Sequence, residues 1–398
     1  MVQVKDDIIV WQTGNEVCQQ DIELETVPLS QESAFVLWQK DIPEEYWSLT
    51  ADEMKERIRI AREKLGSRLV VLGHHYQRED IIQFADFKGD SFRLSQWAAE
   101  RDEAEFIVFC GVHFMAEAAD ILSKPHQKVL LPNMSAGCSM SDMANPDDVL
   151  YCWEQLDSVG LASTTTPVTY MNSTASLKAL CGQNGGIVCT STNAPPVLKW
   201  AYEQRPRVLF FPDQHLGRNT GIKLGIPLDE MVVWDPRQPL GGNTLEQLER
   251  SRIILWRGWC SVHTRFSVEQ INQARAKYPD IKIVVHPECV MEVVQAADCN
   301  GSTEFIARTI TDSPPGSKWA VGTEVNLVSR LARENPDKLV FCLDPVVCPC
   351  STMYRIHPAY LCWVVENLAE GKIVNHLVVP EETARWAKIA LDRMLEVR

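Results

Sequence analysis

The sequence has no pair of cysteines separated by two residues, although it contains thirteen cysteines among 398 residues. This absence argues against zinc-ribbon and ferredoxin sites, which typically contain such tight pairs. No apolar run approaches the roughly 20 residues of a membrane-spanning helix. Near Met1, the sequence lacks the basic segment and the following apolar core that are typical of a signal peptide. We therefore expect a cytoplasmic protein whose cysteines are free thiols or metal ligands rather than disulfides.

Positive charge is also scarce. The 39 Lys and Arg residues are outnumbered by 53 Asp and Glu residues, which gives a formal net charge of -14. This balance argues against general binding to nucleic acids or anionic membranes, although a local cationic pocket could still bind an anionic substrate. The length of 398 residues exceeds what one hydrophobic core usually serves, so we expect two or three domains.

Apolar strand-like runs alternate with helix-like segments from about residue 51 onward. The stretch ADEMKERIRIAREKLG, residues 51–66, is typical of an amphipathic helix that ends at Gly66. RLVVLGHHY, EFIVFCGVHF and RVLFFPDQH are three of the apolar runs, and each ends in polar residues. The alternation indicates βαβ units with parallel sheets that are buried on both faces. The predicted fold class is therefore α/β.

The strand-like runs fall into three groups, and each group ends near a cysteine in a turn-like stretch, namely Cys138, Cys260 or Cys350. The internal similarity of the groups is weak, yet it is suggestive of a repeat. We predict an N-terminal extension at residues 1–50, three similar α/β/α units with short parallel sheets at 51–145, 146–265 and 266–355, and a C-terminal helical segment at 356–398.

Three thiolates at a shared centre suit a four-iron cluster, because one iron would stay open to act as a Lewis acid on a substrate. Spacing alone does not separate the three cysteines from Cys110, Cys189 and Cys289, which also follow apolar runs. Near the C-terminus, Cys348 and Cys350 compete for a single role.

Polar side chains gather where the strand-like runs end, which is where open α/β sheets bind their ligands. Side chains two residues apart on a strand share one side. Three pairs should therefore point together: His74 with Tyr76, Tyr170 with Asn172, and His286 with Glu288. Residues of these types are candidates for acid–base chemistry. The alternatives are a structural His–Tyr pair and polar loop residues that satisfy buried backbone groups.

Two short turns are candidate anion sites, because each precedes a helix-like segment whose free N–H groups could bind carboxylates or phosphates. They contain Ser91 in the sequence GDS, and Ser302 and Thr303 in the sequence GST. Ser191, in CTSTNA, could hydrogen-bond a carboxylate. Ordinary helix capping is the alternative for both turns.

Taken together, the motifs resemble the quinolinate synthase family. GHHYQ, GDSFRLS, AGCSM, VTYMNST, CTSTNA, GWCSVH, HPEC and CSTM stand in the order expected of that family, and the likeness runs from about residue 60 to 395. The resemblance implies three α/β units in a pseudo-threefold arrangement around a central 4Fe–4S cluster. Its cysteine ligands would be Cys138, Cys260 and Cys350, and Met353 selects Cys350 over Cys348 because family members carry the ligand three residues before a Met.

The implied reaction condenses iminoaspartate with dihydroxyacetone phosphate to quinolinate, phosphate and water, on the route to NAD. An L-aspartate oxidase is the candidate partner that would supply iminoaspartate. The implied site residues are His74, Tyr76, Ser91, Tyr170, Asn172, Ser191, His263, His286, Glu288, Ser302 and Thr303. We expect Tyr76, His286 and Glu288 to move protons, while the Ser91 and Ser302–Thr303 turns hold phosphate or carboxylate groups.

Two other classes of protein fit parts of the pattern. A labile three-cysteine cluster also suits an iron–sulfur redox sensor, although the sequence has no recognisable DNA-binding or basic segment. Cys and His ligands would suit a zinc-dependent hydrolase. A brown colour of the anaerobically purified protein would indicate iron–sulfur, and turnover would then separate an enzyme from a sensor.

Overall fold

The computed structural model describes residues 12–13, 16–17, 39, 41–100, 102–346 and 349–397. The chain divides into two compact units, Met1–Asp41 and Ile42–Arg398. In the first unit, β1 (Gln12–Thr13) pairs with β2 (Glu16–Val17) in antiparallel orientation. Most of the predicted N-terminal extension lies outside the described residues, and α1 (Glu45–Ser48) belongs to the second unit.

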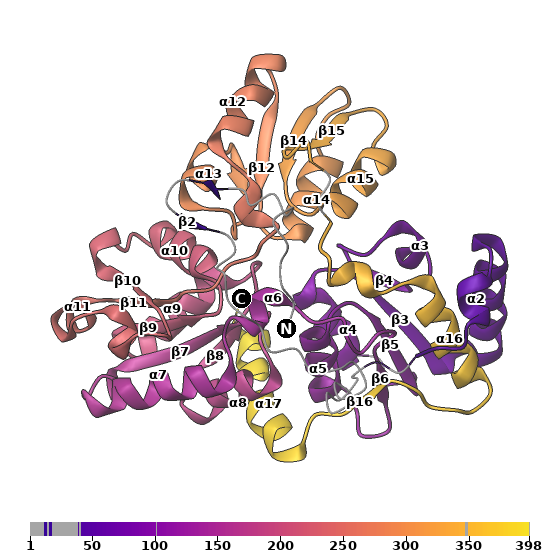
Figure 1. The fold of residues 1–398 in the computed structure, drawn as a ribbon, viewed down its shortest axis with the longest axis horizontal. Coiled ribbons are helices and arrows are strands. Elements are labelled where there is room, and N and C mark those ends of the chain that lie inside the picture. The colour runs from indigo at the N-terminus through magenta and orange to yellow at the C-terminus, as the bar shows by residue number, and fades with distance from the viewer. Residues whose placement is uncertain are drawn as a thin grey trace. The chain divides into compact units, whose positions relative to one another are not determined.

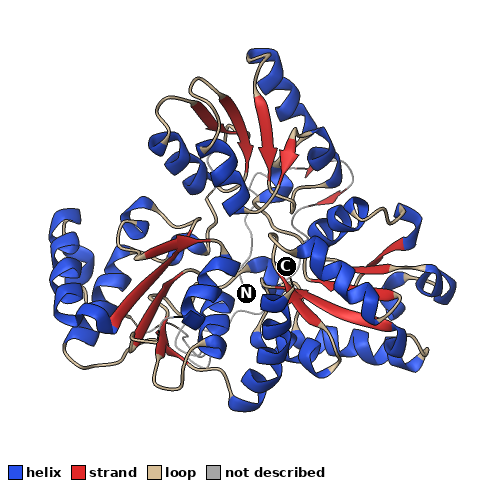
Figure 2. Ribbon diagram, turned by 180° about the vertical axis from the view of Figure 1, so that it is seen from behind, coloured by secondary structure: helices blue, strands red, loops and turns tan. Residues whose placement is uncertain are grey.

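Three separate, mainly parallel sheets make up the second unit, each with helices packed around it (Figures 1 and 2). This architecture confirms the predicted α/β class with three similar α/β/α units. The boundaries proposed between those units stay a prediction. Within the described residues, no helix combines the length and apolar composition that crossing a bilayer demands.

The first sheet has the strand order β16-β6-β5-β3-β4. Its parallel strands are β3 (Leu69–His74), β4 (Phe87–Gly89), β5 (Phe106–Cys110) and β6 (Lys128–Leu130). Its helices are α2 (Ala51–Leu65), α3 (Glu79–Ile82), α4 (Ser91–Glu100) and α5 (His113–Leu122). Helix α2 begins with a capping box between Thr50 and Glu53 and ends at Gly66, whose φ of 56° favours glycine, as the sequence pattern predicts.

The second sheet is fully parallel, with the order β10-β11-β9-β7-β8. The strands are β7 (Thr165–Tyr170), β8 (Ile187–Cys189), β9 (Arg207–Phe211), β10 (Met231–Trp234) and β11 (Ile253–Trp256). The helices are α7 (Pro146–Ser158), α8 (Ala175–Gln183), α9 (Ala194–Gln204), α10 (Gln214–Lys223) and α11 (Leu245–Arg250). Helix α6 (Ser139–Asp142) lies between β6 and α7 along the chain.

The third sheet has the order β13-β12-β14-β15 and is also parallel. It contains β12 (Lys282–Val285), β13 (Cys299–Asn300), β14 (Lys318–Gly322) and β15 (Leu339–Cys342). The helices are α12 (Val268–Lys277), α13 (Met291–Ala296), α14 (Thr303–Thr311) and α15 (Val325–Glu334). Ile283 and Val285 pack into one apolar cluster and Val284 into another, so this sheet is buried on both faces.

The C-terminal segment is shared between two of the sheets. Helix α16 (Pro358–Ala369) packs against α2, and β16 (His376–Leu377) adds an antiparallel edge strand to β6. Helix α17 (Glu381–Glu396) packs against α8. A single large apolar cluster therefore runs through the first two sheets and these helices.

Candidate functional site

One cavity is lined by residues from all three sheets. His74 is the last residue of β3, Tyr170 is the last residue of β7, and His286 directly follows β12. The carboxyl ends of strands from three sheets therefore meet at one place. Every predicted site residue and cysteine ligand except Ser302 lines this cavity.

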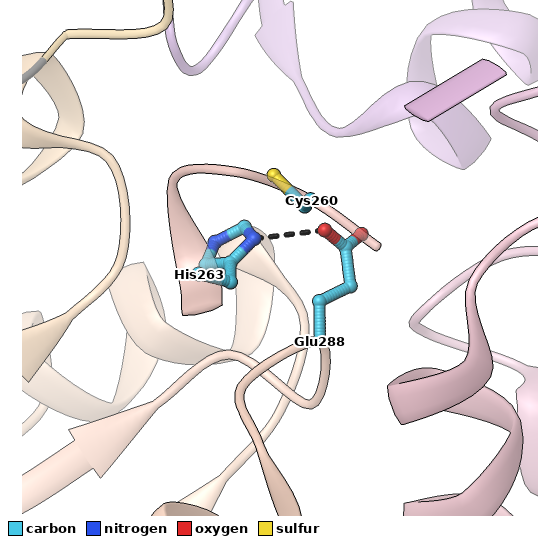
Figure 3. Close-up of side chains that lie close together, drawn as sticks. All are labelled: Cys260, His263 and Glu288. Carbon is cyan, nitrogen blue, oxygen red and sulfur yellow. Dashed lines mark hydrogen bonds and ion pairs between the residues drawn. The ribbon is translucent and has the colours of Figure 1, made fainter. Parts of the chain in front are cut away.

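Glu288 lies at the centre of the polar contacts in the cavity. Its carboxylate accepts a hydrogen bond from the Tyr170 hydroxyl at 2.7 Å and another from His263 Nδ1 at 2.8 Å (Figure 3). The His286 ring stacks on the His263 ring, with 4.4 Å between centroids. Glu288 is only 3% exposed, so these partners replace water as its hydrogen-bond donors.

The surroundings of Glu288 keep it ionised and keep His286 neutral. Burial opposes ionisation of Glu288, but His286, His263 and the bonds from His263 and Tyr170 outweigh that effect and lower the pKa of the carboxyl. Burial lowers the pKa of His286 to about 3, with a further contribution from His263, against the opposing effect of Glu288. At neutral pH, the site therefore holds a carboxylate beside an uncharged imidazole.

Tyr76 reaches the same network from the first sheet. Its hydroxyl shares hydrogen bonds with Thr323 Oγ1 at 2.8 Å and with His263 Nε2 at 3.2 Å. Its backbone N–H donates to His74 Nδ1 at 3.2 Å. Burial, followed by the nearby Glu288 charge, raises the pKa of Tyr76 well above its usual value, so the phenol keeps its proton. Burial and the nearby Glu288 charge raise the pKa of Tyr170 in the same way.

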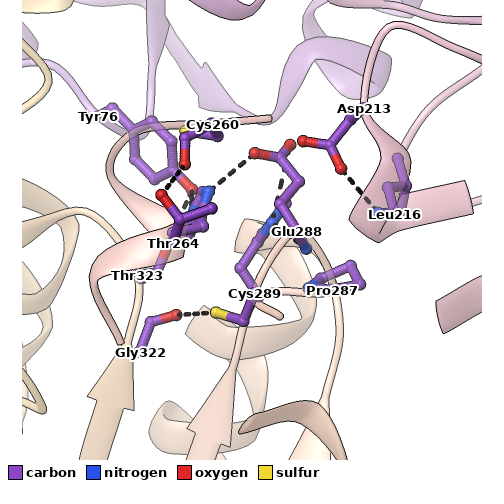
Figure 4. Close-up of polar contacts among 12 residues, drawn as sticks. Tyr76, Asp213, Leu216, Cys260, Thr264, Pro287, Glu288, Cys289, Gly322 and Thr323 are labelled. Atoms are coloured by element: carbon purple, nitrogen blue, oxygen red, sulfur yellow. Dashed lines mark hydrogen bonds and ion pairs between the residues drawn. The ribbon is translucent and has the colours of Figure 1, made fainter. Parts of the chain in front are cut away.

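Two residues of this network were not predicted from the sequence. Thr323, which follows β14, joins Tyr76 to His263. Asp213, which follows β9 and caps α10, presents its carboxyl group to that of Glu288 (Figure 4). Burial and the Glu288 charge raise the pKa of Asp213, so this pair of carboxyl groups carries one negative charge. The polar end of RVLFFPDQH was a signal that could have found Asp213.

The predicted anion-binding turns lie at helix starts, but they face different spaces. Ser91 and Thr303 are the first residues of α4 and α14, and both line the cavity. Thr303 Oγ1 and Asn172 Oδ1 are buried and have no hydrogen-bond partner among the described residues. Ser302 Oγ accepts from Phe305 N as the N-cap of α14, and Ser302 lines a neighbouring cavity. Ser191 lines both cavities.

Cys138, Cys260 and Cys350 reach the cavity from three loops. Cys138 is the N-cap of α6, Cys260 lies between β11 and the short helix His263–Arg265, and Cys350 precedes the short helix Met353–Arg355. Cys350 N–H donates to Glu324 Oε1 at 3.1 Å. Burial raises the pKa of Cys138 to about 12, and Cys350 adds to that shift. All three thiols line one buried cavity, where binding of a metal would stabilise their thiolate forms.

The other cysteines that the sequence left open have different positions. Cys110, Cys189 and Cys289 are fully buried, and none of the three lines the cavity. Cys348 lies outside the described residues. Among the described residues, ligand atoms of Cys260, His263 and Glu288 also lie within 4.8 Å of one another, as a mononuclear metal would require (Figure 3).

Comparison with known proteins gives consistent matches along the chain. A family model described as quinolinate synthetase A protein matches residues 56–396. The chain is 58% identical to the quinolinate synthase of Corynebacterium glutamicum over 359 residues, which are 90% of this chain and 91% of that protein. It is 54% identical to that of a Nocardioides species, covering 85% and 88%, and 53% identical to that of Acidobacterium capsulatum, covering 89% and 95%.

Proposed function

Because the chain belongs to the quinolinate synthase family, an enzyme family of NAD biosynthesis, we propose that its central cavity condenses iminoaspartate with dihydroxyacetone phosphate to quinolinate, phosphate and water. The observation that carries this proposal is that three cysteines and a Tyr–His–Glu network line one buried cavity. A site for small dianionic substrates needs both desolvation and unpaired hydrogen-bonding groups, and the cavity supplies both.

Cys138, Cys260 and Cys350 would hold a 4Fe–4S cluster. They come from loops that follow strands of three different sheets, and all three line one cavity. When bound by three thiolates, such a cluster supplies one iron with an open coordination position that acts as a Lewis acid. Glu288 and His263 are hydrogen-bonded to each other, and they also bond Tyr170 and Tyr76, respectively. These bonds support the three cysteines as the metal ligands over Cys260, His263 and Glu288.

The remaining groups divide into proton-transfer and anion-binding roles. His286 would accept a proton, because its ring stays neutral at working pH. Tyr76 and Tyr170 would donate hydrogen bonds to developing oxyanions, because both phenols stay protonated. Glu288 would orient His263 and Tyr170 and stabilise positive charge on the imidazoles.

The free polar atoms of the cavity suit the phosphate and carboxylate groups of the substrates. Thr303 and Ser91 start helices that are long enough to bind an anion through their backbone N–H groups. Asn172 lines the same space, and its unpaired Oδ1 could accept a hydrogen bond from a substrate N–H or hydroxyl group. Ser191 and Ser302 would complete the binding of substrate where the two cavities adjoin. His74 would contribute a neutral ring, because burial and the nearby His75 lower its pKa.

The test is an anaerobic assay of quinolinate from iminoaspartate and dihydroxyacetone phosphate. Wild type is compared with Cys138→Ala, Cys260→Ala and Cys350→Ala, and iron and absorbance are measured in each. Quinolinate from wild type, with loss of colour and turnover in all three variants, would support the proposal. A brown wild type without turnover would favour a redox sensor, and a colourless zinc protein would favour a hydrolase.

We also propose that an L-aspartate oxidase in the same cytoplasmic compartment supplies the iminoaspartate.

A further inference from the structure

A lysine that the reaction does not use is fully buried beside the cavity. Lys178 lies in α8 and is 0% exposed. A buried ammonium group is costly unless hydrogen bonds and opposite charge replace its water. The groups that surround Lys178 therefore indicate what its position provides.

Lys178 contacts structure from two different sheets. Its Nζ donates a hydrogen bond to the Ser173 carbonyl oxygen, in the turn between β7 and α8. The same Nζ lies 5.6 Å from the centroid of the Phe114 ring, which belongs to α5 of the first sheet. Glu117, one turn further along α5, places a negative charge near the ammonium group and accepts the Ala175 N–H at the start of α8 at 2.9 Å.

Both contacts are made to segments that contribute residues to the cavity. The turn that Ser173 ends begins with Tyr170 and includes Asn172, and Ser173 Oγ donates to the Tyr170 carbonyl at 2.8 Å. Phe114 lines the same cavity. One ammonium group thus bonds the turn that carries two site residues and packs on a ring from another sheet that also lines the cavity.

We infer that Lys178 is a positioning residue: it fixes the Tyr170–Ser173 turn against α5 and so holds the Tyr170 hydroxyl at Glu288 and the Asn172 amide in the cavity. This inference rests on the proposed function for its kinetic readout. Small displacements of substrate-positioning groups cost about a hundredfold in rate, so the effect belongs in kcat.

The charge of Lys178 gives this positioning a pH dependence. Desolvation lowers the pKa of Lys178 to about 8, against the opposing effects of Glu117 and Cys181. Glu117 faces Lys178 from α5, and Glu117 Oε1 lies 3.7 Å from His113 Nδ1. Arg393 of α17 acts on the Cys181 thiol beside Lys178. Above about pH 8 the neutral amine loses its attraction to Glu117, so the turn is held less firmly.

The test compares Lys178→Met and Lys178→Arg with Lys199→Met, a matched control at an exposed lysine in the same sheet region on α9. We expect kcat for quinolinate to fall about a hundredfold in Lys178→Met with KM changed less than about threefold. The iron content should equal that of wild type, and Lys178→Arg should recover part of the activity. We expect wild-type kcat to decline above about pH 8, and we expect no such decline in Lys178→Met. A kcat within about threefold of wild type, or an unchanged alkaline decline, would overturn the inference.

Hydrogen exchange of the peptide that contains residues 170–174 provides a readout without turnover. The inference requires faster exchange in Lys178→Met and wild-type exchange in Lys199→Met; unchanged exchange would refute it. If wild type and Lys199→Met form no quinolinate, the proposed reaction fails, and the exchange measurement still decides the role of Lys178. If Lys178→Met does not fold, the pH profile and exchange of Lys178→Arg decide it.

Discussion

Replacing Glu288 with Gln removes one charge from the centre of the site with little change of shape. The glutamine oxygen can still accept from the Tyr170 hydroxyl, which lies 2.7 Å from Oε1 in the native protein. The amide nitrogen then faces His263 Nδ1, which lies 2.8 Å from Oε2. Two donors meet unless His263 moves its proton to Nε2, on the side of Tyr76 and Thr323.

The magnitude of the effect depends on the role of Glu288. Loss of one charge-assisted hydrogen bond costs about 1.5–3 kcal/mol, which corresponds to a fall in kcat of roughly 10- to 150-fold. That range applies if Glu288 only orients His263. A loss above about a thousandfold would mean that the carboxylate itself takes part in proton transfer.

The assay measures anaerobic quinolinate formation together with the iron content and absorbance of each preparation. Glu246→Gln is the matched control, because Glu246 lies exposed on α11. The proposed cluster should load equally in both variants, since Glu288 is not among its three proposed thiolate ligands. If Glu288→Gln keeps kcat within about threefold of wild type, the reasoning that makes Glu288 central to the reaction is refuted.

Three further predictions concern other parts of the molecule. Cys350→Ser should lose bound iron and Cys342→Ser should retain it, as iron analysis would show, because Cys350 lines the cavity and Cys342 does not; equal iron in both would contradict the assignment. Gly182→Ala should destabilise the protein by at least about 1–3 kcal/mol in denaturant unfolding, since its Cβ would lie 2.0 Å from the Trp386 carbonyl oxygen; an unchanged midpoint would refute this. Between about pH 6.5 and pH 3, the stability of wild type should fall more steeply than that of His286→Asn. The unfolded chain takes up its proton below about pH 6.5, whereas the folded site resists protonation down to a pKa of about 3. Stability from His286 is therefore complete above pH 6.5 and is lost progressively toward pH 3, and parallel stability–pH curves for the two proteins would contradict this sign.

The sequence was most informative about local structure. Apolar runs, helix caps and glycines at helix ends depend on neighbouring residues, so α2 could be located to within a residue from ADEMKERIRIAREKLG. The C-terminal segment was less accessible to such reasoning. Its helices α16 and α17 pack against α2 and α8, and β16 joins the first sheet, because distant apolar faces are complementary.

The candidate site divides in the same way. Polar residues at strand ends pointed to His74, Tyr170 and His286, since the carboxyl ends of parallel strands are where α/β sheets bind ligands. The sequence offered no signal that Thr323 joins Tyr76 to His263. That contact depends on how the ends of β3 and β14 meet in space.

The sequence by itself determined the α/β class, the alternation of strands and helices, and the residue types available at strand ends. It also limited the candidate metal ligands to a few scattered cysteines. Only the tertiary structure decided that Cys138, Cys260 and Cys350 share a cavity that Cys110 and Cys289 do not reach. Secondary structure follows from contacts a few residues apart, whereas an active site is made by side chains more than a hundred residues apart, whose proximity depends on how the sheets pack.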